Sequence, residues 1–206
     1  MGGLIMLEKV TIWLYAKLGY LMMKYWYGPW SRFYRKLFER KYKELPKKWT
    51  DKQILDFFKT CDWTKDKWYM LFDVISKPEK LYKKRKGDCD EYAAFAGEAG
   101  LHNGWIVSVT WYAPHNKFFS RFKGHNVFIF PKDAKWWHIG NWGRYGPYRT
   151  FFDALHAIYK IGDRDAIPCA WSVRSPCSKN GEKDLAFLIG GRFKKDKDGK
   201  RETREG

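Results

Sequence analysis

Three apolar runs separated by turn residues dominate the middle of this sequence. Residues 105–112, 126–130 and 136–139 are rich in Val, Ile, Trp and Phe, and Gly, Pro, Asn and Asp lie between them. β-branched and aromatic residues favour strands, and short polar connections favour hairpins between successive strands. The pattern therefore predicts three strands of an antiparallel sheet.

A capped helix precedes the first of these strands. Asp88 can accept hydrogen bonds from the first backbone N–H groups of a helix, and Glu91, three residues later, completes a capping box. Apolar residues then recur at helical spacing until Gly100, at Tyr92, Phe95, Ala96 and Ala99. This start places Cys89 in the first turn. Its acidic neighbours are interpreted as capping and solvated residues.

Shorter patterns on both sides complete the predicted secondary structure. Thr50-Asp51 is a suitable helix start, and the residues after Pro78 are predicted to be a short basic connector. A first helix is predicted up to Gly28-Pro29 and a second up to Leu45-Pro46, with further helices over residues 51–61, 65–75 and 151–161. Two more strands are predicted over residues 169–173 and 185–189. The sequence therefore predicts an α+β fold.

Composition divides the chain into three parts. Residues 1–49 are predicted to form an aromatic and basic helical extension, residues 50–193 the main domain, and residues 194–206 a charged, disordered tail. Three charged side chains interrupt the apolar stretch near the N-terminus, so no transmembrane span is expected. Packing of the extension against the main domain is the favoured interpretation, and docking on a membrane surface is the alternative.

The charge of the chain predicts attraction to anionic partners. Lys and Arg number 40 against 23 Asp and Glu, which gives a formal net charge of +17. Such an excess favours nucleic acid, acidic membrane surfaces or acidic polymers without selecting one of them. Aromatic residues make up 19% of the chain, which argues against a wholly disordered protein.

The four cysteines show no CxxC spacing, so neither a zinc ribbon nor a thioredoxin-type motif is present. No metal and no cofactor are predicted. Cys169 and Cys177 lie close enough in sequence to be bridged in an oxidising compartment. Because no cleavable signal is recognisable, free thiols and a cytoplasmic location, with peripheral membrane attachment as an option, are the prediction.

Cys89 is the predicted nucleophile. The first turn of a helix favours a thiolate, whereas the acidic neighbours oppose it, so a histidine partner is needed. Among five histidines, His125 alone follows a glycine and starts an apolar strand, which predicts a ring that is fixed but accessible. His138 and His156 are expected to be packed within a strand and a helix, and His102 and His115 to be solvated in loops.

A third group should hold the imidazole in one tautomer. Asn141 ends the strand after that of His125, and antiparallel pairing is expected to bring its amide beside the ring. Asp133 is the competing residue, but it lies in the turn between the two strands and therefore at the far end from His125.

These residues resemble a known pattern. Gly87-Asp88-Cys89-Asp90-Glu91-Tyr92-Ala93, then Gly124-His125-Asn126, then Trp136-Trp137-His138-Ile139-Gly140-Asn141, is similar to the transglutaminase-like family of the papain-like cysteine protease superfamily. The resemblance covers about a quarter of the chain. It implies a papain-like or transglutaminase-like core, in which a Cys-bearing helix packs on an antiparallel sheet, and a catalytic triad of Cys89, His125 and Asn141. The family has Asp where this chain has Asn141, whereas papain-type enzymes have Asn.

The resemblance implies a cysteine peptidase or amidase that acts on a protein or peptide-like amide through an acyl-enzyme. Hydrolysis and transamidation stay open. The backbone N–H of Cys89 is one predicted oxyanion donor, and Gln53, Trp63 or Trp68 is a possible second. The alternative function is a catalytically inactive or non-enzymatic basic module that docks on a membrane surface or an anionic polymer.

Overall fold

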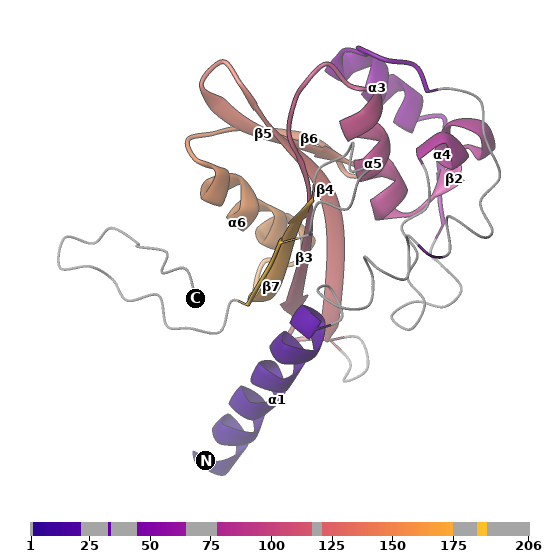
Figure 1. Cartoon of the computed structure of the whole chain (residues 1–206). Helices are drawn as coiled ribbons and strands as arrows, with labels where there is room; N and C mark the ends of the chain where they lie inside the picture. Colours follow the sequence, from indigo (N-terminus) through magenta and orange to yellow (C-terminus); the bar gives the residue numbers. More distant parts are fainter. Residues whose placement is uncertain are drawn as a thin grey trace.

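A six-stranded antiparallel sheet with helices on both faces forms the centre of the protein (Figure 1). The computed structural model describes residues 2–21, 33, 45–64, 78–116, 121–174 and 185–188. The strand order is β6-β5-β4-β3-β7-β8, so the three central predicted strands are sequential neighbours. The α+β class and the antiparallel sheet are therefore confirmed.

The helices are α1 (Gly2–Leu21), α3 (Asp51–Phe58), α4 (Pro78–Lys84), α5 (Cys89–Ala99) and α6 (Phe151–Gly162). The strands of the sheet are β3 (Trp105–Tyr112), β4 (Phe122–Lys132), β5 (Lys135–Gly140), β6 (Gly143–Tyr148), β7 (Ile167–Arg174) and β8 (Leu185–Leu188). A short parallel pair, β1 (Asp62–Trp63) and β2 (Lys86–Gly87), lies beside α5. None of the described helices is long and apolar enough to cross a bilayer.

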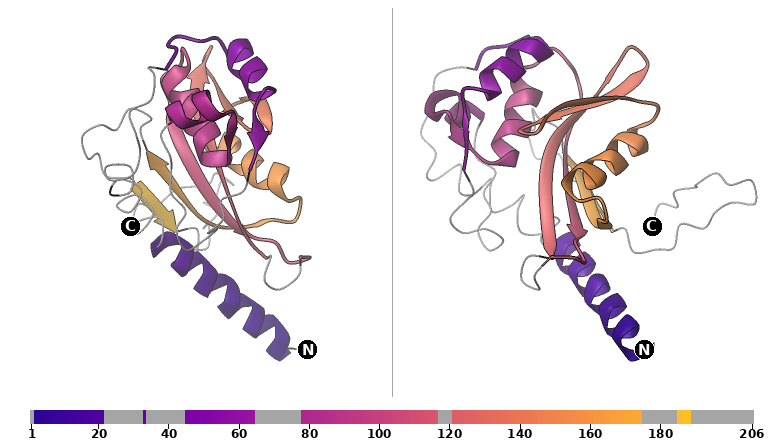
Figure 2. Two further views of the ribbon diagram at one scale, coloured as in Figure 1. Left: turned by 90° about the vertical axis from the view of Figure 1, so that its right-hand side faces the viewer. Right: turned by 180° about the vertical axis from the view of Figure 1, so that it is seen from behind.

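Both faces of the central strands are buried. Alternate residues of a strand point to opposite faces of the sheet. On β4, Phe128 and Phe130 belong to the core shared with α3, α4 and α5, whereas Val127 and Ile129 belong to the core shared with α6. Figure 2 shows these two helical layers on opposite sides of the sheet.

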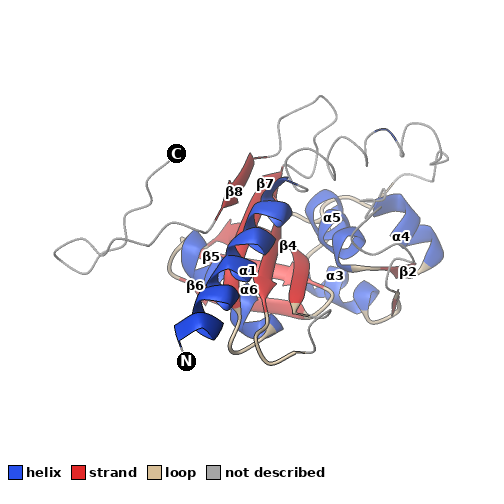
Figure 3. Ribbon diagram, turned by 90° about the horizontal axis from the view of Figure 1, so that it is seen from below, coloured by secondary structure: helices blue, strands red, loops and turns tan. Residues whose placement is uncertain are grey.

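Helix α1 contacts β7, β3 and β8, and it crosses in front of the sheet when the protein is seen from below (Figure 3). It extends away from the rest of the fold in Figure 1. Ala16 is buried in a small core with Tyr112 and Cys169. Tyr15 stacks on Phe122, with ring centroids 5.3 Å apart. One side of α1 is therefore anchored on the sheet.

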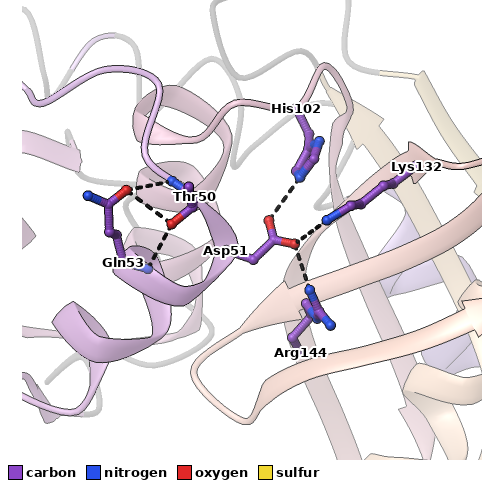
Figure 4. Close-up of polar contacts among 6 residues, drawn as sticks. All are labelled: Thr50, Asp51, Gln53, His102, Lys132 and Arg144. Atoms are coloured by element: carbon purple, nitrogen blue, oxygen red, sulfur yellow. Dashed lines mark hydrogen bonds and ion pairs between the residues drawn. The ribbon is translucent and has the colours of Figure 1, made fainter.

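Asp51 joins α3 to the sheet through three charged or titratable partners (Figure 4). Its Oδ1 lies 2.9 Å from His102 Nε2, and its Oδ2 accepts hydrogen bonds from Arg144 at 2.7 Å and Lys132 at 3.4 Å. Burial raises the pKa of the Asp51 carboxyl, but the hydrogen bond from Arg144 and the charges of His102 and Lys132 outweigh it and lower the pKa overall. His102 is thus paired rather than solvated, which corrects the sequence prediction.

Most predicted boundaries agree with the structure, and the exceptions have local causes. The capping boxes of α3 and α5 are both present. The prediction of a basic connector after Pro78 is wrong, because Pro78 is the first residue of α4. Glu79 lies in the first turn of this helix, and Lys83 and Lys84 lie in its last turn, so the charges are favourable to the helix dipole. Strand β6 was not predicted, because its Gly-Arg-Tyr-Gly-Pro-Tyr sequence has the composition of a turn, yet it pairs as an edge strand. The predicted helix over residues 65–75 and the tail from residue 194 lie outside the described residues.

Candidate active site at the start of helix α5

Cys89 is the first residue of α5, as predicted. The Asp88 carboxylate accepts a hydrogen bond from the Asp90 backbone N–H at 3.0 Å, and Glu91 accepts one from the Asp88 N–H at 2.8 Å. This reciprocal cap fixes the helix start and presents a half-buried thiol at the positive end of the helix dipole.

The acidic residues beside the thiol are buried, which corrects the expectation that they are solvated. Asp88, Asp90 and Glu91 are 8%, 1% and 2% exposed. The start of α5 packs against β4 and α4, and each carboxylate accepts hydrogen bonds there. Asp88, Cys89 and Asp90 hold three possible metal-ligand atoms within 4.8 Å of one another. The Asp88 carboxylate, however, already accepts a hydrogen bond from the helix backbone, and the Asp90 carboxylate accepts one from Asn126 on β4.

Asn126 is the residue of β4 that faces the thiol. Its Nδ2 lies 3.7 Å from Cys89 Sγ and donates a hydrogen bond to Asp90 Oδ1 at 3.1 Å. The Ser108 hydroxyl donates to Asn126 Oδ1 from the neighbouring strand β3, which turns the amide N–H groups toward α5. Sequence reasoning missed this role. The available signal was that Asn126 is a polar residue two positions before Phe128 on the same face of the strand.

His125 points to the other face of the sheet. It pairs with Val109, which belongs to the core under α6, and its ring stacks on Trp142 with centroids 3.5 Å apart. The ring is 4% exposed, and β4 begins three residues earlier, at Phe122. The prediction of an accessible ring at a strand end is therefore wrong, because the strand is longer than its apolar run.

Burial makes His125 a neutral imidazole. It lowers the pKa of His125 to about 3, and the charge of nearby His138 adds to the effect. Burial likewise lowers the pKa of His138 to about 4, and the Tyr148 hydroxyl lies 3.4 Å from its Nε2. A neutral imidazole can accept a proton, but here the ring and Cys89 Sγ lie on opposite faces of the sheet.

Asn141 lies in the turn after β5. The β4-β5 register pairs Phe128 with Ile139, and continuing it places Asn141 opposite Asn126, with Trp142 opposite His125. Among the described residues, neither Asn141 Oδ1 nor His125 Nε2 has a hydrogen-bond partner, although both are buried. These two atoms therefore do not form the predicted hydrogen bond, and the ring stacks on Trp142, the neighbour of Asn141.

Cys89 and His125 therefore lie on opposite faces of β4, and Asn141 lies in the turn that follows β5. Asp133 lies in the turn at the opposite end of this hairpin, as the sequence predicted.

The predicted second oxyanion donors have different positions. Gln53 is occupied in the capping box of α3, Trp63 pairs with Gly87 beside the start of α5, and Trp68 lies outside the described residues. The Asn126 amide is better placed than the Gln53 amide, because it is already directed at the sulfur.

Comparison with protein families and with curated proteins found no match to this chain.

Proposed function

We propose that this protein is a thiol-dependent amidase or peptidase whose nucleophile is Cys89. The observation that carries the proposal is the contact between Asn126 Nδ2 and Cys89 Sγ at the capped start of α5. A thiol held there has two suitable N–H donors nearby, its own backbone N–H at the helix start and the oriented Asn126 amide. Such donors stabilise the negative charge that develops on a carbonyl oxygen during acyl transfer.

In the proposed reaction the sulfur of Cys89 attacks an amide carbonyl and a C–S bond forms. The thiol proton passes through the His125 imidazole to the leaving nitrogen as the C–N bond breaks. Water then cleaves the thioester, which yields a carboxylic acid and restores the thiol. An amine in place of water gives transamidation by the same route.

His125 is the proposed base on the sequence pattern Gly124-His125-Asn126, although its ring lies on the face of β4 away from Cys89. The reaction requires the imidazole to reach the sulfur when substrate is bound, and catalytic hydrogen bonds are often longer or absent in the free enzyme. Asn141 Oδ1 is the buried acceptor proposed to hold the other ring nitrogen, His125 Nε2, at that stage.

The test is site-resolved alkylation of the full chain by iodoacetamide and by a peptide-like electrophile at neutral pH, read by mass spectrometry. Cys61 and Cys169 serve as internal references, since burial raises the pKa of the Cys61 thiol and raises that of Cys169 to about 12. We expect Cys89 to react at least about tenfold faster than both, because a helix start favours its thiolate.

Two variants assign the roles. Asn126→Leu should slow labelling of Cys89 by both reagents, whereas His125→Gln should abolish release of amine from an amide substrate. The proposal is refuted if Cys89 is labelled no faster than Cys61 and if Asn126→Leu does not change the labelling rate of Cys89.

A second candidate function is supported by the orientation of His125. Its burial beneath Trp142, on the face away from α5, favours a protein that has the α+β fold of a thiol enzyme but does not catalyse acyl transfer. This candidate predicts that Cys89 is alkylated with a rate that His125→Gln leaves unchanged, and that no amide substrate is cleaved.

A further inference from the structure

Helix α1 carries large apolar side chains on the side that does not contact the sheet. Five of them are exposed by 46–54% and recur at helical spacing: Val10, Trp13, Leu14, Leu18 and Leu21. The opposite side of the helix, with Tyr15 and Ala16, is the one that packs on β3, β4 and β7. The exposed apolar stripe is therefore additional to the residues that anchor α1 on the fold.

Two lysines lie on this side of the helix, Lys9 beside the stripe and Lys17 within it. Lys9 and Lys17 are exposed, and Lys17 Nζ lies 5.9 Å from the centre of the Trp13 ring. A lysine beside an apolar stripe can keep its ammonium group in the headgroup region while its methylene chain covers apolar surface. Trp is also favoured at the boundary between lipid and water.

We propose that the exposed stripe of α1 docks on the surface of an anionic lipid bilayer, with the helix lying in the interface rather than crossing it. A contiguous row of exposed apolar side chains marks an interaction surface, and lysines beside such a row favour contact with anionic headgroups.

Charge selects the bilayer among the possible occupants. The chain carries a formal net charge of +17, so an anionic surface attracts it, whereas a second copy would bring two strongly basic molecules together. Nucleic acid would use the lysines but leave the five apolar side chains in water. An anionic bilayer is complementary to both features.

The orientation of α1 permits this contact. Figures 1 and 2 show the helix extending from one end of the sheet, with its N-terminus away from α3, α4 and α5. The helix that starts at Cys89 lies in that distant layer, so α1 and the candidate thiol site occupy different ends of the described fold.

The experiment is flotation of the full chain with vesicles of phosphatidylcholine, with and without phosphatidylglycerol. Wild type should float with the anionic vesicles and release at high salt. Trp13→Ser combined with Leu14→Ser should lower the partition coefficient by about tenfold or more, because two apolar side chains no longer enter the interface. The matched control is Trp63→Ser combined with Leu101→Ser, whose wild-type side chains are 54% and 50% exposed against 53% and 54% on α1.

A separate variant tests the electrostatic part. Lys9→Gln with Lys17→Gln should weaken binding to anionic vesicles and reduce its salt dependence. The proposal is overturned if wild type binds neither vesicle, if it binds both equally, or if the α1 variant floats like the control. It is also overturned if sedimentation shows a dimer that Trp13→Ser with Leu14→Ser dissociates, since a second copy would then occupy the stripe. Cys89 labelling should not change in any α1 variant, so the outcome is independent of the proposed thiol chemistry.

Discussion

Two buried neutral histidines should make the protein sensitive to mild acid. Burial lowers the pKa of His125 to about 3 and that of His138 to about 4, against 6.5 for an unperturbed histidine. Below pH 6.5 the unfolded chain binds protons at both residues while the folded protein does not. Stability conferred by the neutral rings is therefore complete above that pH and is lost as the pH falls toward 4.

The expected loss is large. A pH of about 4.5 is about 2 units below the pKa of each histidine in the unfolded chain, and each unit corresponds to about 1.4 kcal/mol. The two histidines together therefore remove about 5 kcal/mol of unfolding free energy at that pH. A domain of this size has a total of about 5–15 kcal/mol, so the protein should be close to unfolding there. Urea denaturation followed by far-UV circular dichroism from neutral pH to this point measures the effect.

Variants identify the groups responsible. His138→Gln removes one titrating ring and should roughly halve the slope of unfolding free energy against pH between 6 and 4.5. His115→Gln is the control, since that side chain is 76% exposed and should leave the slope unchanged. A flat pH profile in wild type, or an unaltered slope in His138→Gln, would show that these rings are not buried as described.

The remaining predictions concern packing and ion pairs. Asp51→Asn should lower the unfolding free energy by about 3 kcal/mol in urea titrations, because it leaves Arg144 and Lys132 without their buried counter-charge. The control is Asp56→Asn, which removes an exposed pair with Lys59 and should have little effect. Equal losses in the two variants would contradict the reasoning. Gly104→Ala should cost about 3 kcal/mol, since the new methyl group has to displace a backbone oxygen; it would lie 2.3 Å from the Ile129 carbonyl oxygen. Gly124→Ala is its control, as the nearest atom lies at an ordinary 3.5 Å, and a similar loss there would refute the steric explanation.

Helix starts and strand positions could be predicted from sequence because their signals are local. Thr50 with Gln53 and Asp88 with Glu91 each satisfy a helix start by short-range hydrogen bonds. The strand β3 was predicted with its observed bounds, since its eight residues are nearly all β-branched or aromatic. The strand β6 was missed because an edge strand needs few apolar residues and tolerates Pro.

The orientation of β4 could not be predicted for a different reason. A strand with one buried face alternates apolar and polar residues, and this alternation tells which side chains point inward. The run from Val127 to Phe130 is apolar at every position, because α5 covers one face and α6 the other. Sequence alone therefore does not tell whether His125 or Asn126 faces Cys89. A shift of the strand register by one residue exchanges the two side chains between the faces of the sheet.

This single choice decides the chemistry available at Cys89. With Asn126 toward α5, the sulfur has an amide donor at 3.7 Å, and the imidazole lies on the far side of the strand beneath Trp142. A donor alone stabilises a thiolate or an oxyanion, but acyl transfer to water also needs a group that moves a proton. The relation between two rates therefore separates the functions: alkylation of Cys89 depends on Asn126 in either case, whereas turnover of an amide depends on His125 only if the ring reaches the sulfur. If Trp142→Ala accelerates turnover of an amide and His125→Gln abolishes it, release of the His125 ring from Trp142 limits the rate of the reaction.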